Sequence, residues 1–433
     1  MRWFGLAVIV LSAPLAAQQP VPSQEAPVEV TLSQAIDRAL QVQPAMVQAR
    51  GDVRNAGMGQ WAANGEFLPT VTTGGSYARA GGTRLNSQTN QIVSAPPTTT
   101  FQGSISASLD LFRGFRRFGD RSAASANRDA ADAGLVNQRF QITLATKQAF
   151  YNALANDELV RVAQSQVTRA QQQLQISIDK LHAGSATRSD SLRSTVDYGN
   201  ARIALLQAQA NLATAQANLG RQIGVNQSVR AIPDTSLPEL PDTATLRTTA
   251  IANSPIVEQA ESQARAAGAQ ITVSRASYMP SISAAIGNSY SGAEAPWTSG
   301  SNFTNGWSAR ITASWTIFDG FSRERTMTNA RVARDVAEAR AADARLQVNA
   351  QLTQQLAALQ TTYEQITIAR DNLAAATEDL RVQNERYRVG AATILDLLTS
   401  QAALTQAQVN VVQTRFNYLI ARAQVEAVVG RSL

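Results

Sequence analysis

The chain repeats one pattern half a chain apart, and this duplication limits its fold more than any other feature. Residues 174–192 read LQISIDKLHAGSATRSDSL, and residues 380–398 read LRVQNERYRVGAATILDLL. Gly184 pairs with Gly390 and Asp190 with Asp396, in both cases 206 residues apart. A constant offset is typical of long helices, because one inserted residue would rotate the whole face of a helix.

Each copy of the repeat predicts the order α–β–β–α–α. Helical patterns cover about 32–66 and 245–277, and longer ones without Pro cover 121–182 and 323–389. Alternation of apolar and polar residues predicts strands at about 67–80, 101–112, 278–291 and 306–318, because strand side chains point to two faces in turn. The segments 81–100 and 291–305 are rich in Gly, Ser, Thr, Asn and Pro, which predicts connecting loops.

The chain divides into four segments. A short basic start, an apolar run and small residues predict a signal peptide at 1–17. The first repeat is expected at 18–224, a linker with three Pro at 225–243, and the second repeat at 244–433. The sequence has no Cys, which excludes disulfides, a lipid anchor on Cys and thiol chemistry.

The returning helices carry a heptad pattern. Leu397, Leu404 and Val411 lie seven residues apart, and each is followed three residues later by Ser, Ala or Thr. Such spacing predicts a coiled-coil seam in which small residues allow close approach. An antiparallel hairpin in a soluble bundle would explain this stretch equally well, but it would not explain the strands.

Four amphipathic strands are too few to close a barrel, and a membrane tolerates no open sheet edge. Three copies of the chain would supply twelve strands, enough for an aqueous lumen. The apolar face carries Tyr77, Tyr290, Trp307 and Trp315 near strand ends, where aromatic girdles of membrane barrels lie. The alternative at this point is a soluble sandwich.

The chain resembles the TolC family of outer-membrane efflux proteins. The resemblance rests on the segment YRVGAATILDLL at 387–398, on the C-terminal run from Gln401 to Ile420 and on the duplicated element order. It implies a mainly α fold with a membrane β-barrel part: a homotrimer whose 12-stranded outer-membrane barrel continues into a long periplasmic α-helical barrel. The linker would form a belt around the helices, and the protein would lie in the outer membrane of a diderm bacterium.

The resemblance also implies a function without catalysis. The protein would be the exit duct of a tripartite efflux or type I secretion system, with a periplasmic adaptor and an inner-membrane pump as partners, and outer-membrane lipid around it. No enzyme activity, metal or cofactor is expected. Nucleic acid is not expected either, because Arg alternates with Asp and Glu. The alternatives are a passive outer-membrane pore and a structural trimeric coiled-coil surface protein.

The repeated turns are the candidate sites. By resemblance, Asp396 points into the periplasmic aperture as one member of an acidic ring, and Tyr387 contacts Asp190. Thr399 stands where relatives have a second Asp, and Ala392 where they have a gate-locking Arg. Thr187 with Asp190, and Thr393 with Asp396, also fit capping boxes, so a purely structural interpretation of both Asp residues is open.

The tips of the two turns are the candidate docking surface for the adaptor. They comprise Gly184, Ser185, Val389, Gly390 and Ala391. The structural interpretation of both glycines is a helix C-cap in the left-handed conformation, which would also shape the tip. His182 is the only His and is expected to be a surface residue, not a metal ligand.

Overall fold

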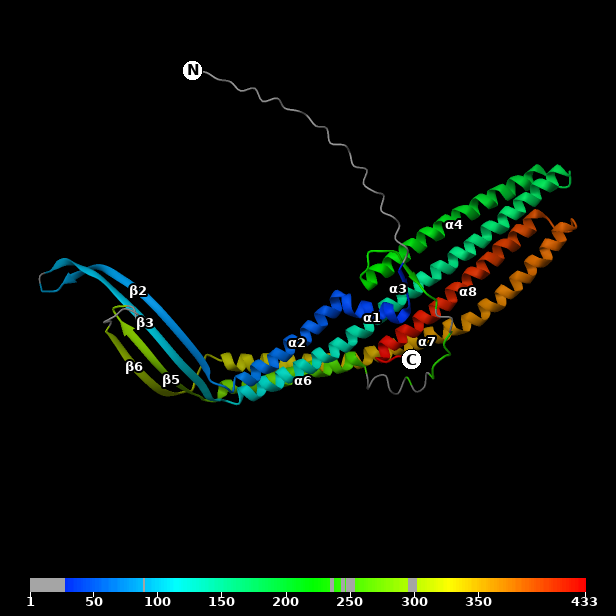
Figure 1. The fold of residues 1–433 in the computed structure, drawn as a ribbon. Coiled ribbons are helices and arrows are strands. Elements are labelled where there is room, and N and C mark those ends of the chain that lie inside the picture. Colours follow the sequence, from blue (N-terminus) through cyan, green and yellow to red (C-terminus); the bar gives the residue numbers. More distant parts are fainter. Residues whose placement is uncertain (1–27, 89, 234–236, 243–245, 247–253, 295–301) are drawn as a thin grey trace, which may run out of the picture.

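The computed structural model describes residues 28–88, 90–233, 237–242, 246, 254–294 and 302–433. The molecule is elongated, with a curled sheet at one end and long helices at the other (Figure 1). The proposed signal peptide at 1–17 lies outside the described residues.

The sheet has four antiparallel strands in the order β2-β3-β5-β6. They are β2 Thr70–Asn86, β3 Gln91–Arg113, β5 Ser281–Gly292 and β6 Phe303–Ser314. The β3–β5 pair joins the two repeats, with Ile105 opposite Asn288 and Ala107 opposite Ile286. Within one chain, β2 and β6 are therefore the open edges of the sheet.

The register gives the sheet two distinct faces. One face carries apolar and aromatic side chains, aligned in rows such as Val71–Ala107–Ile286–Ala309. The other carries small and polar ones, in rows such as Thr72–Ser106–Gly287–Ser308, where the Thr72 and Ser106 hydroxyls lie 2.8 Å apart. The predicted alternation is thus present on all four strands.

The expectation of a loop at 81–100 is wrong. β2 and β3 continue as a two-stranded ribbon beyond β5 and β6 (Figure 1), with pairs from Gly82–Ala95 to Asn86–Gln91. The register shifts between Ala80 and Gly82, opposite the two Pro at 96–97. Pro cannot donate to a ladder and is tolerated at bulges, so the Pro and Gly residues here mark an irregularity within a hairpin.

The helices of the far half lie side by side in the order α4-α3-α8-α7 (Figure 1). α3 Arg116–His182 and α7 Ser322–Arg388 have 67 residues each, or about 100 Å at the usual rise. Their returning partners are α4 Arg188–Ile223 and α8 Ile394–Val429. Nearer the sheet, α3 packs between α2 Pro44–Gly65 and α6 Pro255–Arg275, and α6 packs on α7. η1 Ala276–Tyr278 follows α6.

The helix expected at 32–66 is two helices. α1 Leu32–Val42 ends at Gln43, whose ψ of 128° is extended. Pro44 begins α2, and a residue before Pro is disfavoured in the helical conformation. The Gln43 side chain donates to the carbonyl of Gln222 at 2.5 Å, so the break also attaches this segment to the end of α4.

The largest core lies midway along the helices. β1 Val28–Val30 pairs in parallel with β4 Val229–Ala231, and residues of both strands belong to one buried cluster with Leu219, Phe150, Tyr418 and Val425, which are almost fully buried. The Tyr418 hydroxyl donates to the carbonyl of Pro238 at 2.9 Å. The linker therefore contacts the helices here, and its role as a belt stays a prediction.

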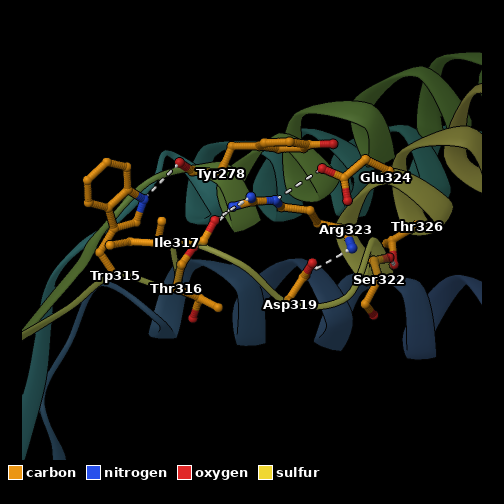
Figure 2. A network of polar contacts seen from close by, with 9 residues as sticks. All are labelled: Tyr278, Trp315, Thr316, Ile317, Asp319, Ser322, Arg323, Glu324 and Thr326. Atoms are coloured by element: carbon orange, nitrogen blue, oxygen red, sulfur yellow. Dashed lines mark hydrogen bonds and ion pairs between the residues drawn. The ribbon is translucent and has the colours of Figure 1, made fainter.

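An Arg in each repeat fastens the junction between strand and helix. Arg323 donates to the carbonyl oxygens of Thr316 and Ile317 at 3.0 and 2.7 Å and lies 5.0 Å from the Tyr278 ring centroid (Figure 2). Arg117, its counterpart, donates to the carbonyl of Leu111 at 3.1 Å. β6 ends at Ser314, earlier than predicted, because these carbonyls bond to Arg323 and not to a neighbouring strand.

No helix in the described part of the chain combines the length and the apolar character that a membrane span requires.

Candidate functional site

The turn between α3 and α4 is a Schellman cap. Gly184 has φ +75°, its N–H donates to the carbonyl of Leu181 at 3.0 Å, and that of Ser185 donates to Lys180 at 2.9 Å. These two bonds satisfy carbonyls that the helix end leaves free. A Cβ on Gly184 would meet open space, so the backbone conformation, not crowding, requires glycine here.

The turn between α7 and α8 repeats this geometry. Gly390 has φ +80°; its N–H donates to Tyr387 at 3.3 Å and that of Ala391 donates to Arg386 at 2.8 Å. Val389, Gly390 and Ala391 are all exposed, as are Gly184 and Ser185 of the first turn. The five residues predicted for docking therefore lie at the free tips of the two helical hairpins (Figure 1).

Both returning helices begin with a capping box. The Asp396 carboxylate accepts from the Thr393 N–H at 2.9 Å and from its hydroxyl at 2.8 Å, and Asp190 accepts from Thr187 in the same way. The hydrogen bond from the Thr393 backbone, then that from its hydroxyl, lower the pKa of Asp396. Asp396 is exposed and therefore stays charged at neutral pH while it caps α8.

Thr399 lies one turn after Asp396 on the exposed side of α8. Its hydroxyl donates to the carbonyl of Leu395 at 2.8 Å, so it is bonded to its own helix. Ala392 packs against a small cluster formed by Leu380, Tyr387, Ile394, Leu397 and Leu404. The position of the implied locking Arg is thus an apolar contact in this chain.

Tyr387 is held by a residue that sequence reasoning missed. Lys180 Nζ donates to the carbonyl oxygen of Tyr387 at 2.8 Å and lies 3.8 Å from the centroid of its ring. Within the described residues, Asp190 is bonded to Thr187 and not to Tyr387. The contact of Tyr387 that joins the two repeats is therefore with Lys180 of α3.

The signal that could have identified Lys180 is its residue type. Lys147 and Lys180 are the only lysines among 38 basic residues. Both reach the other repeat, since Lys147 forms an ion pair with Glu426 of α8. Arg386, the counterpart of Lys180 in the second repeat, instead donates to the carbonyl of Ala391 in its own turn at 3.3 Å.

His182 is exposed beside the first tip. Within the part of the chain that the structure describes, no three His, Cys, Asp or Glu residues gather in a way that could hold a metal ion.

Comparison with known proteins adds the family. The sequence profile described as "Outer membrane efflux protein" matches residues 35–225 and 246–431. The outer membrane efflux protein BepC of Brucella suis is 22% identical, over 98% of this chain and 89% of that protein. Among solved structures, the outer membrane protein VceC of Vibrio cholerae has a TM-score of 0.79 at 17% identity, covering 93% of this chain and 96% of its own. The CmeC outer membrane channel of Campylobacter jejuni also has a TM-score of 0.79, at 15% identity over 92% and 85%.

Proposed function

The chain belongs to the outer membrane efflux protein family, and from this premise we propose that it is the exit duct of a tripartite efflux or type I secretion system. It lies in the outer membrane of a Gram-negative bacterium, with a large helical part in the periplasm. An inner-membrane pump and a periplasmic adaptor supply the substrate and the energy, because the family is one of channels, not of enzymes.

The observation that carries the proposal is that, within one chain, the sheet and the layer of helices are each open at both sides. The sheet exposes β2 and β6 at its edges, and the helical layer ends in α4 and α7. Unpaired strand edges are not tolerated in lipid, so copies must join β2 to β6 head to tail. Three copies close a ring of twelve strands, and α4 of each copy then meets α7 of the next.

Exposed apolar residues support this closure. Four apolar side chains of α4 are 57–66% exposed in the single chain: Leu192, Val196, Ile203 and Leu206. A helix whose surface faced only water would not be expected to carry so many exposed apolar side chains. In a closed ring these side chains face α7 of the neighbouring copy, which has its own exposed Leu346, Ile368 and Val382.

The lining of the sheet suits an aqueous lumen. Its polar face carries Ser, Thr and Gly together with Arg310 and Asp110, and its other face carries Ile105, Ile286 and Ile311, all more than half exposed. The apolar face turned to lipid and the polar face to water satisfy both environments, as in other membrane barrels. A passive pore would need the same sheet but not helices of 67 residues.

The tips of the helical hairpins are the proposed gate and docking surface. Three copies of Asp396 form an acidic ring at the aperture, and Lys180 takes over from the missing Arg by holding Tyr387. The capped turns at Gly184 and Gly390 are rigid knobs that the adaptor receives. The purely structural role of these turns is compatible with both functions, because a well-defined cap makes a reproducible surface.

The test combines location, assembly and transport. We expect the full-length protein in the outer-membrane fraction, as a detergent-stable trimer by light scattering, with ion conductance in planar bilayers. Deletion of its gene should sensitise cells to compounds that its pump exports, and the wild-type gene should restore export. A monodisperse monomer, or conductance without any transport defect in the deletion strain, would contradict the proposal.

A further inference from the structure

An apolar groove lies on the sheet at the end far from the helices. It has a volume of about 700 Å³ and is lined by Tyr77, Phe101, Tyr290 and Phe303. Glycines face these rings across the strands: Gly292 stands between Phe101 and Phe303, and Gly103 stands opposite Tyr290. A Cβ on Gly103 would meet no atom within 4 Å, whereas one on Gly292 would lie 3.0 Å from the Phe303 ring. Gly103 therefore leaves space beside Tyr290, and Gly292 allows the Phe303 ring to lie close to the backbone, so the groove depends on the register of the strands.

In the proposed channel, on which this inference rests, the groove lies on the lipid-facing side of the sheet. Tyr77 and Phe101 are opposite each other, with ring centroids 4.9 Å apart, and they share a face with Ile105 and Ala107 further down β3. That face is the apolar one. A groove of aromatic rings on this face is suited to a hydrocarbon chain, since the polar lumen lies on the other side of the sheet.

Arg79 stands directly beyond the groove. It is two residues from Tyr77 along β2 and therefore on the same face, opposite Thr99. Its side chain is exposed and forms no ion pair with any described residue. Residues 78–100 contain two Arg and no Asp or Glu, so no acidic residue of this ribbon competes for the guanidinium.

The height of the groove matches the outer surface of the membrane. The 12 residues from Phe303 to Ser314 span about 40 Å along the strand, or about 30 Å along the membrane normal at the usual tilt of such barrels. Trp315 and Tyr278 then lie at the periplasmic surface, where the helices begin (Figure 2). The groove and Arg79 lie at the opposite, outer surface.

We propose that this end of the sheet binds one phosphorylated, acylated glycolipid of the outer leaflet, the lipid A part of lipopolysaccharide. An acyl chain lies in the groove against Tyr77 and Phe101, and a phosphate accepts hydrogen bonds from Arg79, because a guanidinium fork fits phosphate geometry. A dephosphorylated glycolipid or a purely apolar lipid would offer Arg79 no phosphate. A phospholipid of the inner leaflet does not reach this height.

The test uses native mass spectrometry of the full-length assembled protein, titrated with bis-phosphorylated lipid A, with its dephosphorylated form and with phosphatidylglycerol. We expect bis-phosphorylated lipid A to bind most tightly. Arg79→Gln should weaken the binding of this lipid about tenfold and leave the binding of the dephosphorylated form unchanged. The double variant Tyr77→Ser with Phe101→Ser, which removes both rings, should weaken the binding of both forms of lipid A.

Arg310→Gln is the matched control. Arg310 is an exposed Arg of the same sheet but lies on the polar face, opposite Ala285, so its exchange should change no lipid affinity. Equal binding of the two lipid A forms by the wild type, equal loss in Arg310→Gln, or phosphatidylglycerol binding as tight as lipid A would each overturn the inference. Trimer formation and export measured on the same variants keep this outcome separate from that of the proposed channel function.

Discussion

Lys180 of the first repeat lies over the ring of Tyr387 in the second, 3.8 Å from its centroid, and donates a hydrogen bond to the carbonyl of the same residue at 2.8 Å. The two residues lie in the last turns of α3 and α7. Their contact joins hairpin tips that are otherwise built alike. Because Arg386, at the position equivalent to Lys180, bonds within its own turn, the two repeats are not interchangeable at the tip.

The first prediction removes this contact. Lys180→Met keeps the aliphatic stem but loses the ammonium, and with it a charged hydrogen bond and a cation–π contact that together are worth about 1–3 kcal/mol. We expect amide hydrogen exchange at residues 381–393 to accelerate about tenfold or more and the resting conductance to rise. Arg188→Met, which removes an exposed cation of the same tip, should do neither. Unaltered exchange in Lys180→Met would rule out the contact as a tie between the tips.

The second prediction tests the docking tips through backbone conformation. Gly390→Val places a β-branched residue at φ +80°, which costs about 1–2 kcal/mol or more and distorts the knob. We expect export to fall strongly while trimer formation and membrane insertion remain. Gly199→Ala is the control, because this glycine lies inside α4 with free space around it; it should stabilise the protein slightly. Normal export by Gly390→Val and by Gly184→Val would count against docking at these turns.

The third prediction concerns the other lysine. Lys147 and Glu426 form an ion pair between α3 and α8, with side chains only 16% and 10% exposed. Lys147→Met leaves a largely buried carboxylate with Arg422, 3.8 Å away, and the Leu433 N–H, 3.3 Å away, as its remaining partners, and should cost about 3 kcal/mol. Adding Glu426→Gln should recover much of this loss. Thermal unfolding of the wild type and the two variants measures these changes, and a double variant no more stable than Lys147→Met would show that the charge is not the cause.

The sequence predicted the architecture well where one periodicity extended over many residues. The offset between Gly184 and Gly390 correctly predicted two equal caps, and the capping boxes at Thr187 and Thr393 are present. The break at Pro44 was missed because apolar residues continue with helical spacing on both sides of it. The ribbon at 82–95 was missed because its Gly and Pro residues indicate a loop, although tertiary pairing between β2 and β3 overrides that local preference.

The contact of Lys180 with Tyr387 could not be predicted from periodicity. It depends on which hairpins lie next to each other, and a repeat predicts what each hairpin is like, not how the hairpins are arranged. The resemblance to the family suggested Asp190 as the partner of Tyr387. In this structure the cation beside Tyr387 is Lys180 of the neighbouring hairpin, while Ala392 packs against the apolar cluster that includes Tyr387.

The last prediction concerns Asp396. If three copies of Asp396 ring the aperture, Asp396→Asn removes clustered negative charge from the narrowest point of the channel. Cation preference and block by a trivalent cation should both fall in single-channel recordings, and Thr399 offers no second charge to replace it. Because the side-chain oxygen of Asn can still accept the hydrogen bond from the Thr393 N–H, the variant should keep α8 intact. Glu385→Gln, at an exposed residue that pairs with Arg388, should leave block unchanged.

The pH dependence separates the ring from a mere cap. Hydrogen bonds from Thr393 lower the pKa of Asp396 below its usual 3.8 in a single chain, so the capping contribution is complete above pH 3.8 and is lost only as the pH falls through the lower, folded value. Three carboxylates close together raise one another's pKa by repulsion. Loss of cation block with a midpoint above 3.8 therefore indicates a tight ring. Block that persists to lower pH, or that is identical in Asp396→Asn, would leave Asp396 as a helix cap and place the gate elsewhere.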